Sequence, residues 1–181
     1  MWHALLREPR FFDLLYKLDQ DLAEQAQSQG CPCGGRLDRA NYPRKPRGGP
    51  ADLSPKHELR HSFCCHRDGC RSRTTPSSLR FLDRRVYFGV SIILLTAMTQ
   101  GVSPRRVREL RTHLGVDRRT LVRWQVWWRE HFPASRFWRE QRARLSPVLC
   151  DAGLPGTLLD RFAPQGEPDG IVSLLRFLAP I

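Results

Sequence analysis

The sequence predicts a mainly α fold that carries one small β element, and three observations lead to that class. Apolar residues recur at three- and four-residue spacing along most of the 181-residue chain, as in amphipathic helices. Residues 31–75 interrupt this pattern with cysteine pairs, prolines and glycines. A pair of helical segments with capping and turn signals then follows from residue 103.

The first predicted element is a helix over residues 2–28. A stripe of leucine and phenylalanine residues runs along it, Pro9 marks its start or a kink, and Gly30 ends it. Its acidic side chains, Asp19 among them, are expected on the other faces. We therefore expect this helix to pack against another helix or a second subunit rather than against a polyanion.

Two closely spaced cysteine pairs bracket a basic, proline- and glycine-rich loop. The first pair reads Cys31-Pro32-Cys33-Gly34-Gly35 and the second reads Cys65-His66-Arg67-Asp68-Gly69-Cys70. Zinc takes four soft donors in a tetrahedron, and tight turns between cysteines supply them two at a time. We therefore expect a small β zinc ribbon with one structural Zn²⁺, and these ligands: Cys31, Cys33, Cys65 and Cys70.

The ligand set leaves alternatives open. The first pair has one intervening residue instead of the usual two, and Cys64 could replace its neighbour Cys65. A strand over residues 59–65 would put Phe63 and Cys65 on one face, which favours Cys65. The reserve ligands are histidines: His57, His61 and His66. Cysteines without any metal are the other interpretation, and Cys150 is expected to be a small buried apolar residue.

The positive charge of the chain is concentrated in two blocks. The net charge is +12; residues 36–85 hold 13 basic and 5 acidic side chains, and residues 103–144 hold 12 and 4. This distribution suits a partner with regularly spaced negative charge, such as DNA or RNA. A GC-rich genome could explain why 27 of the 30 basic residues are arginine, but not why they gather on the motif-bearing segments.

Residues 79–100 predict a long helix that is apolar nearly all round and therefore centrally buried. Its apolar run, Val86 to Met98, is shorter than the roughly 20 residues that span a bilayer as a helix. Residues 1–30 lack a small-residue cleavage site of the kind that ends a signal peptide. We therefore expect a cytoplasmic, nucleoid-associated protein with no membrane partner.

A helix-turn-helix pattern follows. Ser103-Pro104 predicts a helix start with the serine as N-cap, and Gly115 closes that helix. Asp117 caps a second helix from Arg118 to about His131. The inner positions of the second helix are Leu121, Trp124 and Trp128. Pro133 is expected to stop or redirect the chain.

In such a motif the second helix enters the major groove, and arginines pair with guanine or with phosphates. We expect four arginines of the first helix over the DNA backbone: Arg105, Arg106, Arg108 and Arg111. The start of the second helix is expected at the base edges: Arg118, Arg119, Thr120 and Arg123. Val122 and Val126 also face outward in this prediction, whereas Trp127 is assigned either to the core or to the phosphate side. An ordinary helical hairpin with a solvated arginine face is the alternative.

The rest of the chain is expected to form a helix over residues 135–145, a short helix, a break at 164–170 and an apolar final turn over 171–178. The predicted organisation has four parts: an N-terminal amphipathic helix (1–30), a zinc-ribbon-like domain with a basic loop (31–78), a helix-turn-helix domain (79–145) and a C-terminal helical tail (146–181).

These motifs resemble the N-terminal DNA-binding part of bacterial insertion-element transposases and their accessory proteins. The resemblance covers roughly residues 31–130 and rests on the first cysteine pair, Phe63-Cys64-Cys65, Cys70-Arg71-Ser72-Arg73, and the run from Gly115 to Trp124. It implies a zinc ribbon followed by a homeodomain-like helix-turn-helix that binds element ends. The short first knuckle departs from that family.

The chain also departs from the family because no catalytic domain follows. The ribonuclease-H-like core of such enzymes holds two magnesium ions with three carboxylates on a mixed sheet. The acidic residues after Trp138 lie in a short segment without a strand pattern, which leaves no room for that fold.

The sequence therefore predicts a non-catalytic, zinc-stabilised protein that binds double-stranded DNA as an accessory or regulatory factor of a bacterial mobile element. A transposase or recombinase and a second copy of the chain are candidate protein partners. Two alternatives stay open, a transcriptional regulator of a host operon and a protein- or RNA-binding adaptor.

Overall fold

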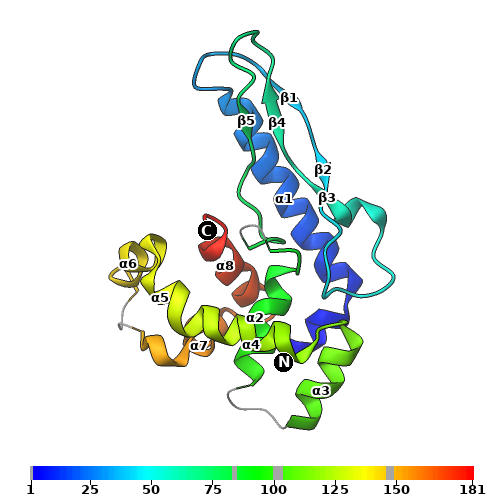
Figure 1. The fold of residues 1–181 in the computed structure, drawn as a ribbon, viewed down its shortest axis with the longest axis vertical. Helices are drawn as coiled ribbons and strands as arrows, with labels where there is room; N and C mark the ends of the chain where they lie inside the picture. Colours follow the sequence, from blue (N-terminus) through cyan, green and yellow to red (C-terminus); the bar gives the residue numbers. More distant parts are fainter. Residues whose placement is uncertain (1, 83–84, 100–103, 146–148) are drawn as a thin grey trace.

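The computed structural model describes residues 2–82, 85–99, 104–145 and 149–181, apart from the side chains of Trp2, His3, Arg106 and Leu110. It is mostly helical, with two small antiparallel sheets (Figure 1). The mainly α class with a small β element is thereby confirmed. No described helix combines the length and the apolar character that crossing a membrane requires.

Helix α1 (Pro9–Gln29) runs from the helical body alongside the two sheets (Figure 1). A 3-10 helix, Trp2–Arg7, precedes it, and Pro9 occupies its first turn as predicted, where a missing N–H costs nothing. Gly30 ends it with a φ of 71°, a conformation that favours glycine.

The sheets form the ribbon. Strands β1 (Leu37–Arg39), β4 (Phe63–Cys65) and β5 (Arg73–Thr74) make one antiparallel sheet in the order β1-β4-β5. Strands β2 (Tyr42–Pro43) and β3 (Leu59–Arg60) make the second. The predicted strand over 59–65 is thus split in two. A small core of Ala23, Leu37 and Phe63 joins β1 and β4 to α1 and to the buried cysteines.

The helical body is arranged around α2 (Gly89–Met98), whose residues from Gly89 to Thr96 are all buried. Helices α3, α4, α7 and α8 all contact it. The other helices are α3 (Pro104–His113), α4 (Arg118–Val126), α5 (Phe132–Ala134), α6 (Arg136–Arg142), α7 (Gly156–Phe162) and α8 (Asp169–Leu178), with 3-10 helices at Pro55–Glu58, Asp151–Gly153 and Ala163–Gln165.

The helix predicted over 79–100 begins only at Gly89. The described residues before it form bends and isolated bridges instead of a helix, and the bridges join Phe81 to Phe88 and Arg47 to Tyr87. A buried apolar run is compatible with either an extended segment or a helix, so periodicity alone could not place this boundary.

Pro133 does not stop the second predicted helix. A π-helical turn, Trp127–His131, follows α4 directly and leads into α5, so the helix continues to Ala134. The wider turn precedes the proline, which has no N–H to give to an α-helical bond. The chain turns at Ser135, whose hydroxyl accepts a hydrogen bond from the Trp138 N–H and caps α6.

The C-terminal segment is part of the main core. Helices α7 and α8, separated by the predicted break, pack on α2 and bury Ile171, Leu174 and Leu178 completely. The same core contains Leu6 and Phe12 from the N-terminal segment. Residues from 1–30, 79–145 and 146–181 therefore share one hydrophobic core.

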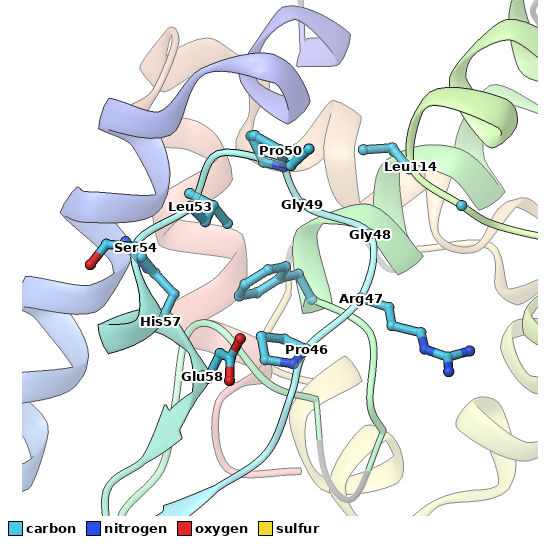
Figure 2. A pocket seen from close by; sticks show the side chains of 13 residues that line it. Pro46, Arg47, Gly48, Gly49, Pro50, Leu53, Ser54, His57, Glu58 and Leu114 are labelled. Carbon is cyan, nitrogen blue, oxygen red and sulfur yellow. The ribbon is translucent and has the colours of Figure 1, made fainter.

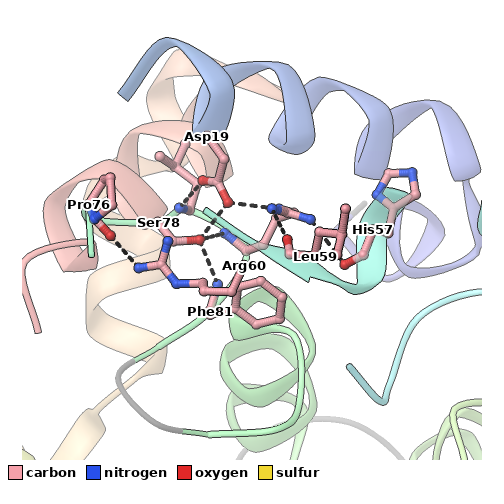
Figure 3. Close-up of polar contacts among 9 residues, drawn as sticks. Asp19, His57, Leu59, Arg60, Pro76, Ser78 and Phe81 are labelled. Atoms are coloured by element: carbon pink, nitrogen blue, oxygen red, sulfur yellow. Dashed lines mark hydrogen bonds and ion pairs between the residues drawn. The ribbon is translucent and has the colours of Figure 1, made fainter. Parts of the chain in front are cut away.

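A buried ion pair fixes the ribbon on the helical body. The Asp19 carboxylate accepts hydrogen bonds from Arg80 Nε at 2.7 Å, the Leu79 N–H at 2.6 Å and the Ser78 hydroxyl (Figure 3). The Arg80 guanidinium also donates to the carbonyls of His57, at 3.0 Å, and Leu59, at 2.9 Å. The sequence places Asp19 on a face away from the apolar stripe, yet its carboxylate is fully buried, because these donors satisfy its charge.

Candidate metal centre

Four cysteines from three parts of the ribbon converge at the C-terminal end of α1. Their Sγ atoms all lie within 4.8 Å of one another, with 3.7 Å between Cys31 and Cys70 and 3.5 Å between Cys33 and Cys65. The structure thus brings together the four cysteines that the sequence singled out, in a group that could hold a metal ion. No other group of three or more His, Cys, Asp or Glu side chains with this property occurs among the described residues.

The first knuckle is closed by its two glycines. The Gly34 N–H donates to the Cys31 carbonyl at 2.8 Å, the Cys31 N–H donates to the Gly35 carbonyl at 3.0 Å, and Gly34 has a φ of 81°. A Cβ on Gly35 would lie 2.6 Å from the Sγ of Cys65 and 3.3 Å from that of Cys33. The sulfurs can gather here only because position 35 has no side chain.

The second knuckle follows β4. Cys65 pairs with Leu37 across β1 and β4, which directs it into the small core, and it is fully buried. The Cys70 N–H donates to the Arg67 carbonyl at 3.2 Å, and Gly69 turns the chain with a φ of 82°. Because Cys33 and Cys70 are only partly buried, the group reaches the protein surface on one side.

The environment gives the thiols of Cys33 and Cys65 different pKa values. A hydrogen bond from the backbone N–H of Gly35 lowers the pKa of Cys33 to about 6, and the neighbouring thiols contribute further lowering. The backbone N–H of Arg67 lowers the pKa of Cys65, but burial and the other thiols outweigh it and raise that pKa to about 12. Cys33 is therefore the more acidic of these two thiols.

The other candidate ligands lie outside the group. Cys64 points to the opposite face of β4, where its Sγ lies 3.5 Å from the Arg71 carbonyl oxygen. His66 pairs with Asp38, whereas the other two reserve histidines are buried elsewhere: His57 and His61. Cys150 is exposed and not buried as predicted, because it lies in the surface turn that leads into the 3-10 helix Asp151–Gly153.

The two helices of the second basic block are joined by a four-residue turn. Gly115 takes a φ of 62°, and the Val116 N–H donates to the Arg111 carbonyl at 2.8 Å. Asp117 caps α4 as predicted, since its carboxylate accepts from the Thr120 N–H at 2.7 Å. This hydrogen bond lowers the pKa of Asp117. Trp124 and Trp128 lie in the core as predicted.

The structure exposes most of the residues predicted to contact DNA. These are Arg105, Arg108, Arg118, Arg119 and Arg123. The prediction that Thr120 faces outward is wrong. Its side chain is buried and only 3% exposed, because its hydroxyl donates a hydrogen bond to Asp117 and accepts one from Arg123. The side chain of Arg106, and Ser103 as a whole, lie outside the described residues.

The sequence did not predict two features of the fold, the Asp19–Arg80 ion pair and the position of Lys45 and Arg47. In the sequence, Asp19 and Arg80 are single charged residues near apolar segments, and no pattern indicates that they pair. Lys45 and Arg47 belong to the predicted basic loop, but only the folded structure shows that both are exposed next to the start of α2.

Comparison of this chain with protein-family models, with curated proteins and with solved structures finds no match. Function is therefore inferred from the geometry of these two regions.

Proposed function

We propose that this protein is a non-catalytic, zinc-stabilised protein that binds double-stranded DNA through α4. One observation carries the proposal: α4 presents three arginines around an exposed apolar residue, Val122, which is 46% exposed. The opposite side of the same helix is anchored in the core by Leu121 and Trp124. A rigid helix with a cationic face that includes an apolar contact suits base edges and the thymine methyl group.

The surroundings of α4 support a helix-turn-helix of the homeodomain-like kind. Helix α2 contacts both α3 and α4, and a tight turn joins the last two. Arg119 and Arg123 are four residues apart, so they share one face of α4. Arg105 on α3 pairs with Glu109, whereas neither Arg119 nor Arg123 makes a salt bridge in the part of the chain that the structure describes. Ion pairs of this kind stabilise a solvent-exposed helix, so their absence at Arg119 and Arg123 among the described residues leaves both guanidinium groups available for a phosphate or a base.

The cysteine group supports zinc as the metal. Four sulfurs at about 2.3 Å from a tetrahedral Zn²⁺ lie about 3.8 Å apart. The observed separations of 3.7 Å and 3.5 Å are close to that value even between free thiols. Four protein ligands leave no open position, so the ion would be structural. The three apolar residues beside the cysteines form too small a core to hold the ribbon alone, so its folding would depend on the ion.

The metal proposal is tested by zinc stoichiometry. Purified protein should contain about one zinc per chain. Cys65→Ser should lose that zinc because it removes a ligand, while Cys64→Ser should retain it. A folded wild-type chain without zinc, or loss of zinc in Cys64→Ser alone, would contradict the assignment.

The DNA proposal is tested by selection from a random pool of duplexes with the full-length, zinc-loaded chain. We expect an enriched motif, as sequence-specific binding requires. The resemblance to transposase DNA-binding regions further supports a role at the ends of a mobile element, and this role predicts that the motif occurs as inverted copies flanking the gene. Failure to enrich any motif would oppose sequence-specific binding.

A further inference from the structure

The loop from Arg44 to Pro50, hereafter the basic loop, is anchored to the start of α2. The Arg47 N–H donates to the Val86 carbonyl at 2.8 Å, and the Phe88 N–H donates to the Arg47 carbonyl at 2.9 Å. The Ser91 hydroxyl on α2 donates to the Gly48 carbonyl. A Cβ on Gly49 would lie 2.7 Å from the Phe88 ring, so the loop approaches α2 more closely than a side chain allows.

The same anchor lies against the core-facing side of the proposed DNA-binding helix. The ring of Tyr87, which is bridged to Arg47, packs edge-on at 5.0 Å against Trp124 of α4. The loop also borders a cavity of about 450 Å³ that Leu114 and Gly115 of the α3–α4 turn line from the other side (Figure 2). Figure 2 shows the Arg47 side chain pointing away from this cavity. Lys45 and Arg47 are both exposed.

The backbone of Lys45 is in a conformation that disfavours lysine. Its φ is 47°, and among the described residues only Lys45 and Arg71 have a positive φ without being glycine. Glycine or asparagine would adopt this conformation at lower cost. An exposed cation at such a position, where another residue would cost less, favours a role for its charge. Pro46 and Pro50 restrict the loop, which reduces the entropy lost when it binds a partner.

From these observations we propose that the basic loop is a second DNA contact, in which Lys45 and Arg47 bind backbone phosphates beside the groove that α4 enters. This inference rests on the proposed function and extends it. An ammonium and a guanidinium suit phosphate oxygens, and phosphate contacts fix the orientation of a recognition helix without reading sequence. The loop would thus set how α4 is held on the duplex.

The test compares Lys45→Asn, Arg47→Gln and the double variant with a matched control, Arg161→Gln, which changes an exposed arginine of α7. The zinc-loaded chains are titrated with the selected duplex at several salt concentrations. The double variant should lose on the order of tenfold or more in affinity, and its salt slope should decrease by about 2, with about 0.9 for each lost phosphate contact. The preferred motif should not change. Lys45→Asn should melt no lower than the wild type, because asparagine tolerates the backbone conformation.

Three outcomes would overturn the inference, and they are distinguishable. If Arg123→Ala impairs binding but the loop variants match Arg161→Gln in affinity and salt slope, the basic loop is not a contact and the proposed function stands. If the loop variants change the preferred motif, the loop reads bases and the assignment to phosphates is wrong. If the wild type binds no duplex, the proposed function and this inference fail together.

Discussion

Gly35 is the residue on which the closeness of the four thiols depends most directly. It contributes no ligand, yet it occupies the space between two of them. The choice between Cys64 and Cys65 is a similar single-residue matter, because alternation along β4 sends the two side chains to opposite faces. At this scale, the cysteine group depends on the missing side chain at Gly35 and on the face of β4 on which each thiol lies.

We predict that Gly35→Ala lowers zinc affinity by on the order of tenfold or more, because the new methyl group would lie 2.6 Å from the Cys65 sulfur. Competition with a chromophoric chelator measures this. Cys64→Ala changes a neighbouring residue outside the group and should keep the wild-type affinity. Equal zinc affinity in Gly35→Ala and the wild type would show that the space left by Gly35 is not needed for metal binding.

At the scale of elements, local signals predicted the boundaries that depend on caps and turns. Pro9, Gly30, Asp117 and Gly115 all act where the sequence placed them, because each acts through its own backbone or side chain. The start of α2 could not be predicted, since the segment before it is held in part by a bridge between Tyr87 and Arg47, which are distant in sequence. The exposure of Thr120 was mispredicted because its hydroxyl joins the cap of its own helix.

Asp117 gives a prediction for α4. Asp117→Ala should lower the melting temperature by about 3 °C, because the first turn loses its acceptor, and Asp117→Asn should restore most of it. The pKa of Asp117 is below its ordinary value, so its contribution is present above about pH 4 and is lost as the pH falls through the lowered pKa. Thermal melts of both variants between pH 2 and 7 test this. The prediction would be contradicted if the difference in melting temperature between the wild type and Asp117→Ala grew as the pH falls.

At the scale of the whole molecule, two cores share α1. Its N-terminal half belongs to the helical body and its later residues to the ribbon, while Asp19 lies at the joint between them. The composition of both cores could be predicted from apolar spacing and from the cysteines. The joint could not, because the buried ion pair and its hydrogen bonds connect three segments, α1, residues 57–59 and residues 78–80, that only the complete fold brings together. The described N- and C-terminal segments are likewise joined to the body by packing that no local pattern specifies.

We predict that Asp19→Ala lowers the free energy of unfolding by about 3–5 kcal/mol, because it leaves the Arg80 guanidinium buried without its counter-charge. Asp21→Ala on the same helix removes an exposed carboxylate and should stay within about 0.5 kcal/mol of the wild type. Denaturant unfolding measures both. Equal stability of the two variants would show that the joint does not hold the ribbon on the body.

The central claim is that this zinc-bearing chain recognises double-stranded DNA through α4. A fluorescence-anisotropy titration of the full-length, zinc-loaded wild type and of Arg123→Ala, with the selected duplex and a scrambled one, tests it most directly. We predict that the wild type prefers the selected duplex by on the order of a thousandfold, with affinity that falls steeply as salt rises. Arg123→Ala should lose about 1–3 kcal/mol of that preference. Equal wild-type affinity for both duplexes, or a response that does not depend on salt, would contradict the claim.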